Sequence, residues 1–227
     1  MRHGETELNK LNRVQGWVDS PLTEDGLKIA TLCGLGLREI DFDVAYSSDL
    51  LRAVRTAEVI LEQNNQKEIP YHALKNLREI SFGQFGGECK NIYKTACSRI
   101  LFGEENISLL NEKIKAKEIT PKDLIDAGCS SDTSKQSETY NSFENRIISE
   151  VKGIFEKAQK NGDKKVLLVG HGIATYVLLN YFSNGSVNYI SDVKNASVSR
   201  LKYENYKIIA EEVVSMEYVN IGKKLKI

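Results

Sequence analysis

Residues 166–172 read Val-Leu-Leu-Val-Gly-His-Gly, an apolar run that ends at a histidine between two glycines. Four consecutive valine and leucine residues are typical of a strand that is buried on both faces of a parallel sheet. Residues 173–182 follow with the length and composition of a helix. The stretch therefore predicts a junction from strand to helix, the repeating unit of α/β folds.

The same order of elements occurs earlier in the chain. Residues 44–48 read Val-Ala-Tyr-Ser-Ser and have the length and composition of a short buried strand. Apolar residues then recur at helical spacing from Ala53 to Leu61, and Asp49 stands between the two segments. Aspartate is a preferred N-cap residue, so we expect Asp49 to cap this helix.

Three further segments complete the predicted fold. Thr23 is an N-cap candidate that precedes an acidic turn and an apolar helical face. Apolar residues recur at three- and four-residue spacing across 143–158, which predicts a long helix with one buried face. Residues 197–203 and 206–214 flank a polar turn and predict a hairpin at the edge of the sheet. We therefore predict an α/β fold, a three-layer sandwich with a mostly parallel sheet, helices on both faces and a helical cap insertion.

The cap is assigned to residues 86–140, which are polar and show only weak helical patterning. We interpret this interval as a mobile cap over the core, because it lacks the pattern of a separate domain. The chain has 227 residues, of which 41% are hydrophobic, and this is enough to bury one full core. We expect a single domain over residues 1–227, with the cap inserted at about 86–140.

Charge and cysteine content exclude several classes of protein. The chain has 31 lysine and arginine residues against 31 aspartate and glutamate residues, so no net charge attracts it to nucleic acid or to an acidic membrane. Its four cysteines form no C-x-x-C pair and no secretory signal precedes them, which favours free thiols in a reducing cytosol. No apolar run approaches the length of a membrane span. We expect a cytoplasmic protein without nucleic-acid or membrane partners, and a homodimer stays open.

Two histidines occupy positions where chemistry is expected. His3 lies between Arg2 and Gly4, and His171 follows the predicted strand at 166–169. Ligands of open α/β sheets bind in the crevice outside the carboxyl ends of the strands, so the two histidines can meet across one cleft. A neutral His3 would present a ring nitrogen to phosphorus as a nucleophile.

Charged residues supply the other parts of a phosphate site. Arg52 lies in the first turn of a predicted helix, where backbone N–H groups and the helix dipole favour an anion. With Arg2, it can clamp a phosphate through forked donors. Glu79 lies between Leu77 and Ile80, and partial burial among apolar residues would favour its protonated form. Glu79 is therefore the candidate general acid, and it can act as the base on water in the second half of the reaction.

Short motifs lie in order along the chain. They are R-H-G-E-T-E-L-N at 2–9, R-V-Q-G at 13–16, D-S-P-L-T at 19–23, S-S-D-L-L-R-A-V-R-T-A at 47–57, E-I-S-F-G at 79–83 and G-H-G at 170–172. In this order they resemble the motifs of the histidine phosphatase superfamily, specifically its branch related to phosphoglycerate mutase. The resemblance covers most of the chain.

The resemblance implies catalytic roles for His3 as nucleophile, Glu79 as proton donor and His171 as a hydrogen-bond partner of the transition state. It also implies that further residues line the site. These are the phosphate-binding residues Arg2, Arg52 and Asn9, and the substrate-binding residues Gln15, Gly16, Thr23 and Gly172. Neither C-x-x-C nor H-x-x-x-H spacing is present, so we expect no metal and no cofactor.

Two features depart from the family pattern. Phe85 is followed by Gly86-Gly87 where related sequences often have glutamate after the aromatic residue, so one carboxylate is left out. Only Met1 precedes Arg2, where the family has an apolar strand. We therefore expect the natural protein to begin several residues earlier, with a central strand of about five to seven residues that is absent from this chain.

The expected function is hydrolysis of a small phosphorylated metabolite through a phosphohistidine intermediate. Two alternatives stay open. A phosphoglycerate mutase uses the same intermediate, but family mutases carry paired arginines in a longer cap, and residues 86–140 contain only Arg99. A catalytically silent binding module is the other alternative, and the intact set of predicted catalytic residues argues against it.

Overall fold

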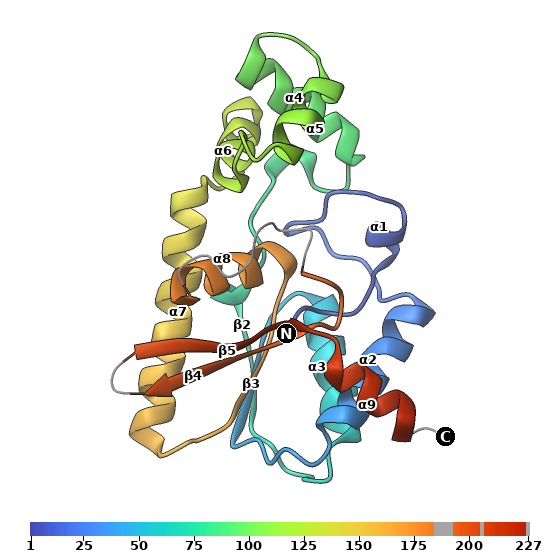
Figure 1. Cartoon of the computed structure of the whole chain (residues 1–227), viewed down its shortest axis with the longest axis vertical. Coiled ribbons are helices and arrows are strands. Elements are labelled where there is room, and N and C mark those ends of the chain that lie inside the picture. Colours follow the sequence, from blue (N-terminus) through green and yellow to red (C-terminus); the bar gives the residue numbers. More distant parts are fainter. Residues whose placement is uncertain (184–192, 205–206, 226–227) are drawn as a thin grey trace. The chain divides into compact units, whose positions relative to one another are not determined.

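The chain combines short strands with many helices (Figure 1), and its computed structural model describes residues 1–183, 193–204 and 207–225. Its strands are β1 (Val44–Ser48), β2 (Tyr71–Leu74), β3 (Val166–Val169), β4 (Val198–Glu204) and β5 (Lys207–Ser215). Its helices are α1 (Glu7–Lys10), α2 (Glu24–Leu37), α3 (Leu51–Gln63), α4 (Lys90–Phe102), α5 (Ile107–Lys115), α6 (Pro121–Ser131), α7 (Tyr140–Asn161), α8 (Gly172–Ser183) and α9 (Glu217–Leu225), together with the 3-10 helices η1 (Lys75–Leu77) and η2 (Gly83–Phe85).

The chain divides into two compact units. Unit 1 holds residues 1–6, 20–79 and 146–227, and unit 2 holds residues 7–19 and 80–145. The interval assigned to the cap falls within unit 2, where it forms α4, α5 and α6.

The sheet of unit 1 has β1 at its centre. Strands β2 and β3 pair with β1 in parallel, in the order β2-β1-β3. Ala45 is paired with Tyr71 on one side and with Leu167 on the other, and every residue of β1 is buried. This arrangement confirms the predicted strands at 44–48 and 166–169 and their parallel pairing.

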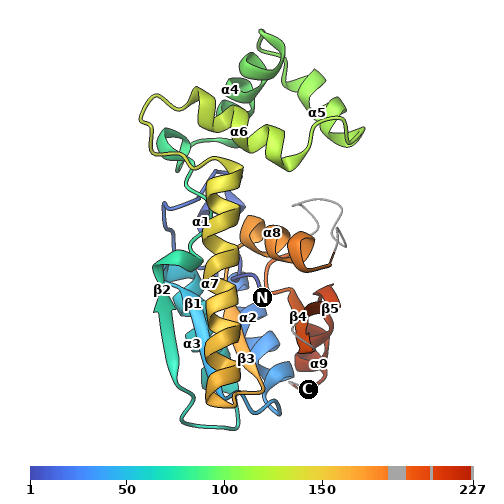
Figure 2. The same cartoon turned by 90° about the vertical axis from the view of Figure 1, so that its left-hand side faces the viewer.

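Helices cover both faces of this sheet. On one face α3 packs against β1 and β3, α2 packs against α3, and α9 packs against α2. The part of α7 that belongs to unit 1 lies over the other face, as two views at right angles show (Figures 1 and 2). From that helix, the Lys157 ammonium lies 6.0 Å from the ring centre of Tyr46 in β1. The predicted α/β fold with helices on both faces is confirmed.

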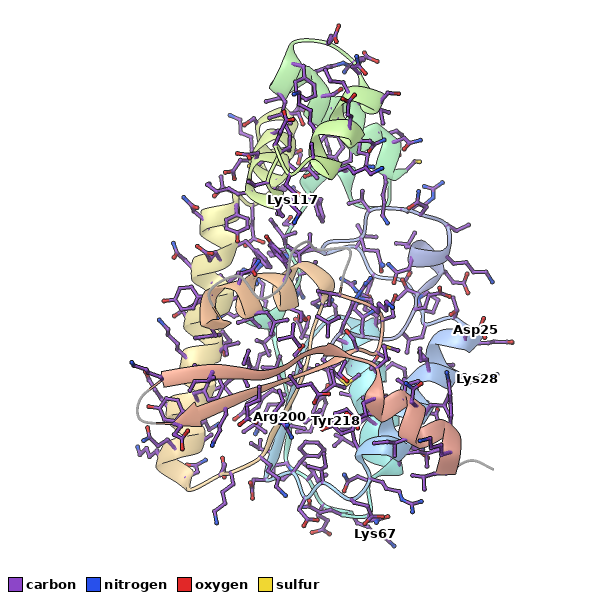
Figure 3. The ribbon with its side chains drawn as sticks, viewed as in Figure 1. Asp25, Lys28, Lys67, Lys117, Arg200 and Tyr218 are labelled. Atoms are coloured by element: carbon purple, nitrogen blue, oxygen red, sulfur yellow. The ribbon has the colours of Figure 1, made fainter. Side chains whose placement is uncertain are left out.

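Helix α2 begins where the sequence predicts it. The Thr23 hydroxyl accepts a hydrogen bond of 2.9 Å from the Gly26 backbone N–H and so satisfies one of the free donors at the helix start. Cys33 lies on the buried face of the helix. Asp25 and Lys28 are exposed, and Figure 3 shows both pointing outward from α2. The amphipathic pattern thus sets which side of α2 faces the core.

The predicted cap of α3 is wrong. The N-cap residue is Leu50, which makes no side-chain capping bond. The Asp49 carboxylate instead accepts two hydrogen bonds from the Arg78 guanidinium, at 2.6 and 2.7 Å. A two-pronged ion pair with arginine is stronger than a neutral capping bond, so Asp49 turns toward Arg78.

The predicted hairpin forms, but its pairing differs from the prediction. Strands β4 and β5 are antiparallel, and the residues of the turn between them lie outside the described part of the chain. Within the described residues they form a two-stranded sheet of their own and are not edge strands of the parallel sheet. Arg2 lies between the two sheets, because it bridges to Gly170 and its N–H donates to the Ser197 carbonyl at 3.1 Å.

Unit 2 has its own small core. Its buried apolar residues come from α4, α5, α6 and the segments before them, and include Phe85, Tyr93, Leu110 and Ala127. Tyr93 makes edge-on ring contacts with Phe82 and Phe85, at centroid distances of 5.2 and 5.3 Å. These contacts hold the 3-10 turn η2 against α4.

No helix in the described part of the chain is long and apolar enough to cross a lipid bilayer.

Candidate active site

Main-chain pairing brings the two predicted catalytic histidines together. The His3 N–H donates to the Gly170 carbonyl at 2.9 Å, and Gly170 immediately precedes His171. The two imidazole rings lie with their centres 5.3 Å apart and their planes inclined by 63°. Both side chains are buried. Residues far apart in the sequence therefore meet at the carboxyl end of β3.

The hydrogen bonding of His3 determines its tautomer. Its Nδ1 lies 2.7 Å from the Gly4 carbonyl oxygen, which can only accept a hydrogen bond. Nδ1 therefore carries the proton and Nε2 carries the lone pair. Burial, followed by the positive charges of Arg52 and Arg2, lowers the pKa of His3 well below its usual value. His3 is therefore a neutral imidazole with a nucleophilic Nε2 at neutral pH.

The Thr56 hydroxyl connects the His3 segment to the helix that carries Arg52. It accepts a hydrogen bond of 3.0 Å from the Gly4 N–H and donates one of 2.7 Å to the Arg52 carbonyl. Gly4 also lies very close to α2, since a Cβ atom on Gly4 would be 2.6 Å from the Gly26 carbonyl oxygen. A glycine is required at this contact, and it lets the backbone beside His3 pack directly on the helix.

The backbone of Val193 holds the side chain of Arg2. Its Nη1 donates to the Val193 carbonyl at 2.6 Å. A Cβ atom on Gly172 would lie 3.4 Å from the Arg2 Nε, so Gly172 leaves room for the guanidinium. Burial lowers the pKa of Arg2, while the charge of Glu79 opposes this shift. An arginine keeps its charge in proteins, so Arg2 remains a cation.

The side chain of Glu79 lies against the first turn of α8. Its two carboxylate oxygens accept hydrogen bonds from the backbone N–H groups of Ile173 at 2.9 Å and Ala174 at 3.1 Å. These donors and the positive end of the helix dipole stabilise the ionised carboxylate. This differs from the expectation that apolar surroundings alone set the protonation of Glu79.

His171 has buried ring nitrogens that no described residue satisfies. Neither Nδ1 nor Nε2 has a hydrogen-bond partner, and the same holds for the Nε of Arg2. Burial, followed by the charges of Arg52, His3, Arg2 and Arg146, lowers the pKa of His171 well below its usual value. A buried polar atom without a partner costs about 1–3 kcal/mol, so these three nitrogens indicate a place for a ligand with acceptor oxygens.

The charges of this cluster favour an anion. Arg2 and Arg52 are buried or partly buried cations, Glu79 supplies one negative charge, and both histidines are neutral. An excess of positive charge in a buried site attracts a phosphate group. Across the described residues there is no group of three or more histidine, cysteine, aspartate or glutamate side chains that would hold a metal ion.

The structure brings six of the predicted residues together in unit 1: Arg2, His3, Arg52, Glu79, His171 and Gly172. Thr23 also lies in unit 1, where its hydroxyl caps α2 and donates to the Glu5 carboxylate at 3.0 Å. Asn9, Gln15 and Gly16 belong to unit 2. The substrate-side roles of these four residues stay predictions.

Several residues that support the site were not singled out from the sequence. Thr56 belongs to the motif at 47–57, and nothing else in the sequence marks its role in the site. Val193 acts through its backbone carbonyl, which accepts from Arg2, and Asn195 donates from its side chain to the His3 carbonyl at 3.0 Å. Arg146 donates to backbone carbonyls of residues 76–79. No local pattern marks contacts of this kind.

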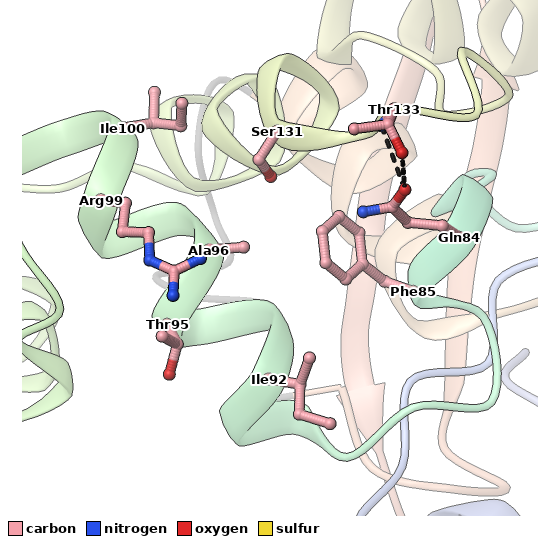
Figure 4. A pocket seen from close by; sticks show the side chains of 9 residues that line it. All are labelled: Gln84, Phe85, Ile92, Thr95, Ala96, Arg99, Ile100, Ser131 and Thr133. Carbon is pink, nitrogen blue, oxygen red and sulfur yellow. Dashed lines mark hydrogen bonds between the residues drawn. The ribbon is translucent and has the colours of Figure 1, made fainter.

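Unit 2 contains two pockets of its own. The larger has a volume of about 480 Å³ and is lined by α4 and by Gln84, Phe85 and Thr133 (Figure 4). The side-chain oxygen of Gln84 accepts hydrogen bonds from the Thr133 N–H and hydroxyl, at 3.1 and 2.6 Å. The smaller has a volume of about 180 Å³, and its wall includes Gln15 and Trp17. One predicted substrate residue therefore lines a pocket.

Comparison with known proteins agrees with this geometry. The sequence matches the histidine phosphatase superfamily (branch 1) over residues 1–101 and 108–215. A 2,3-bisphosphoglycerate-dependent phosphoglycerate mutase of Buchnera aphidicola is 32% identical over 217 residues, which cover 90% of this chain and 91% of the relative. The crystal structure of a phosphoglycerate mutase from Bacillus anthracis has a TM-score of 0.89 at 36% identity, covering 98% of this chain and 94% of that one.

A more distant structure shares the fold alone. It is a phosphoserine phosphatase from Entamoeba histolytica, crystallised with 3-phosphoglyceric acid, with a TM-score of 0.69 at 20% identity and coverage of 96% of each chain. The phosphoglycerate mutases are thus similar in both sequence and structure, and the family match spans nearly the whole chain. The chain is an enzyme of the histidine phosphatase superfamily, branch 1.

Proposed function

We propose that the protein is a phosphoglycerate mutase that carries the transferred phosphoryl group on His3. The neutral tautomer of His3 supports this proposal most directly, because it leaves the Nε2 lone pair available for attack on phosphorus. Three relatives that are 30% or more identical over most of the chain are named phosphoglycerate mutases, which favours this reaction over hydrolysis.

In the first step, Nε2 of His3 attacks the phosphorus of a bound phosphate ester. The bond from nitrogen to phosphorus forms while the bond from phosphorus to the leaving oxygen breaks. Arg2 and Arg52 neutralise the charge on the phosphoryl oxygens. His171 is neutral and donates from one ring nitrogen to one of these oxygens, which gives its buried ring a partner.

Glu79 supplies the proton that the leaving oxygen takes up. In the free protein its carboxylate is ionised and accepts hydrogen bonds from the start of α8. A phosphate dianion placed beside it disfavours a second negative charge, so substrate binding promotes protonation of Glu79. The carboxyl group then protonates the leaving hydroxyl and returns to the ionised form.

In the second step, a hydroxyl oxygen attacks the phosphorus of phosphohistidine. Glu79 removes the proton of that hydroxyl, and the bond from His3 to phosphorus breaks. In a mutase the attacking hydroxyl belongs to the phosphorylated product that stays in the site. In a phosphatase it belongs to water, and inorganic phosphate is released.

Hydrolysis remains the second candidate because of one feature of the chain. Residues 86–140 contain a single arginine, Arg99, where a mutase of this family is expected to have a pair. The guanidinium of Arg99 is ion-paired with Glu105. A single arginine whose charge is already neutralised by a glutamate offers less positive charge to a substrate carboxylate than two arginines would.

The test supplies 3-phosphoglycerate with a catalytic amount of 2,3-bisphosphoglycerate and a chelator. Formation of 2-phosphoglycerate and release of phosphate are measured in the same sample. We expect isomer formation to exceed phosphate release. Rapid phosphate release without isomer would support the phosphatase, and no turnover of any phosphomonoester would indicate a silent binding module.

A further inference from the structure

The segment that carries Glu79 lies outside the strands of the described residues. It follows the 3-10 turn η1 and precedes η2. Contacts to its backbone and to its carboxylate therefore determine where the carboxyl group lies. A displacement of about 1 Å in a reacting group can reduce a rate by about 100-fold, so these contacts matter for the chemistry.

Arg146 of α7 binds this segment through its backbone. Its Nη1 donates to the carbonyls of Asn76 at 2.9 Å and Arg78 at 3.0 Å, and its Nη2 donates to the carbonyl of Glu79 at 3.2 Å. The planar guanidinium presents donors in a rigid fork, which lets one side chain hold several carbonyls at once. Lysine has a single nitrogen and cannot reproduce this pattern.

A second anchor holds the same segment from the phosphate-binding side. Arg78 forms its two-pronged ion pair with Asp49, which directly follows β1 and lies three residues before Arg52. The pair is partly buried, and hydrogen bonding by Arg78 lowers the pKa of Asp49. The residue beside the candidate acid is thus linked to the turn that leads into α3, the helix that carries Arg52.

We infer that Arg146 is a positioning residue for Glu79, with the Asp49–Arg78 pair as its counterpart. The fork of Arg146 fixes the backbone at 76–79, so that the Glu79 carboxyl stays at the start of α8, beside the histidines. The hydrogen bonds that place this segment go from Arg146 to backbone carbonyls. The charge of Arg146 also lowers the pKa of His171, and Arg146→Lys keeps that charge while it removes the fork. This inference rests on the proposed role of Glu79 in the phosphoryl transfer.

The test measures phosphoryl transfer to His3 by rapid quench, with an alkyl phosphate and with an aryl phosphate whose leaving group is good. Only the alkyl substrate needs a proton on the departing oxygen. We expect Arg146→Gln to slow transfer from the alkyl phosphate by about 10- to 100-fold and transfer from the aryl phosphate by about 2-fold or less. Arg146→Lys retains the charge and should show the same preference. Lys152→Gln, an exposed site on the same helix, is the matched control and should leave both rates unchanged.

A double-mutant cycle with Glu79→Gln separates positioning from a general structural role. If Arg146 acts through Glu79, adding Arg146→Gln to Glu79→Gln causes no further loss with the alkyl phosphate. A further loss of the same size in that background, or equal losses with both substrates, would overturn the inference. If Arg146→Gln does not fold, the same cycle with Asp49→Asn decides the question.

The cycle also reveals a failure of the proposed function. Glu79→Gln alone should slow the alkyl substrate far more than the aryl substrate. If that variant slows both equally, Glu79 is not the proton donor and the inference about Arg146 falls with it. If Glu79→Gln shows the preference and Arg146→Gln does not, only the inference about Arg146 is wrong.

Discussion

Two buried neutral histidines make the stability of the fold depend on pH. Burial lowers the pKa values of His3 and His171 well below their usual value, so both stay unprotonated in the native state as the pH falls below about 6.5. In the unfolded chain both take up a proton near that pH. The unfolded state then binds more protons than the native state, and the free energy of unfolding decreases as the pH decreases.

The size of this effect follows from the number of groups. Each histidine that is neutral in the native state and charged in the unfolded state contributes about 1.4 kcal/mol per pH unit. Two such groups give a limiting slope of about 2.7 kcal/mol per pH unit, and about half of that at pH 6.5, where the unfolded histidines are half protonated. Lowering the pH from 6.5 to 5.0 should therefore cost about 3 kcal/mol. Against a typical stability of about 5–15 kcal/mol, this is a large loss.

The assay is urea unfolding at intervals of half a pH unit between pH 5.0 and 7.0. Other buried groups titrate in this range, including the Met1 amine, whose pKa is lowered to about 6 by burial. Wild type and His171→Gln must therefore be compared at each pH, because the glutamine variant removes only one titrating group. We expect the variant to show about half of the histidine-dependent slope.

His72→Gln is the matched control, because His72 lies on β2 with an exposed side chain. This variant should follow the wild-type curve at every pH. If His171→Gln also runs parallel to wild type between pH 5.0 and 6.5, then His171 is protonated in the native state. The assignment of a neutral ring at that position would then be wrong.

Three further predictions follow from single residues. His3→Ala should abolish turnover while the fold persists, and an acid-labile phosphoryl label that still forms on the variant would place the nucleophile elsewhere. Thr56→Val leaves the buried Gly4 N–H without its acceptor, so the free energy of unfolding should fall by about 1–3 kcal/mol and phosphoryl transfer should slow, whereas Thr56→Ser should retain both. Asp132→Asn should destabilise unit 2, because the Asp132 carboxylate accepts hydrogen bonds from the backbone N–H groups of Gln84, Ser134, Gln136 and Ser137. Thermal melting measures this change, and an unchanged melting curve would contradict the prediction.

The strands and main helices of unit 1 could be predicted because their signals are local. Residues 44–48 are buried along their whole length, residues 166–169 alternate between half-buried and buried, and Thr23 caps α2 as its side chain predicts. The pairing of the hairpin could not be predicted. It depends on the backbone of Arg2, which lies between Gly170 and Ser197, and no residue type encodes that position.

The residues that meet in the candidate site could be predicted from the sequence, but the contacts that support them could not. His3, His171, Arg52 and Glu79 stand in recognisable motifs next to predicted junctions. The tautomer of His3 depends on one backbone carbonyl, that of Gly4, and backbone carbonyls look alike in every sequence. For Asp49 a local signal was misleading. Its residue type predicts a helix cap, but its carboxylate binds Arg78, which lies 29 residues further along the chain.

The contacts that support the site are made largely to backbone carbonyls, and there is a physical reason for this. A phosphate site needs buried cations and neutral histidines, and in the free protein these groups cannot all be satisfied, as the bare nitrogens of His171 and Arg2 show. Side chains that paired with those nitrogens would stabilise the free protein and compete with the substrate. Contacts made to the carbonyls of Gly4, Val193 and residue 79 fix the reacting groups and leave the substrate-facing atoms unoccupied. On the proposed function, hydrogen bonds from these atoms to phosphate oxygens would regain the free energy that the free protein gives up there, and this gain would favour binding of the anion.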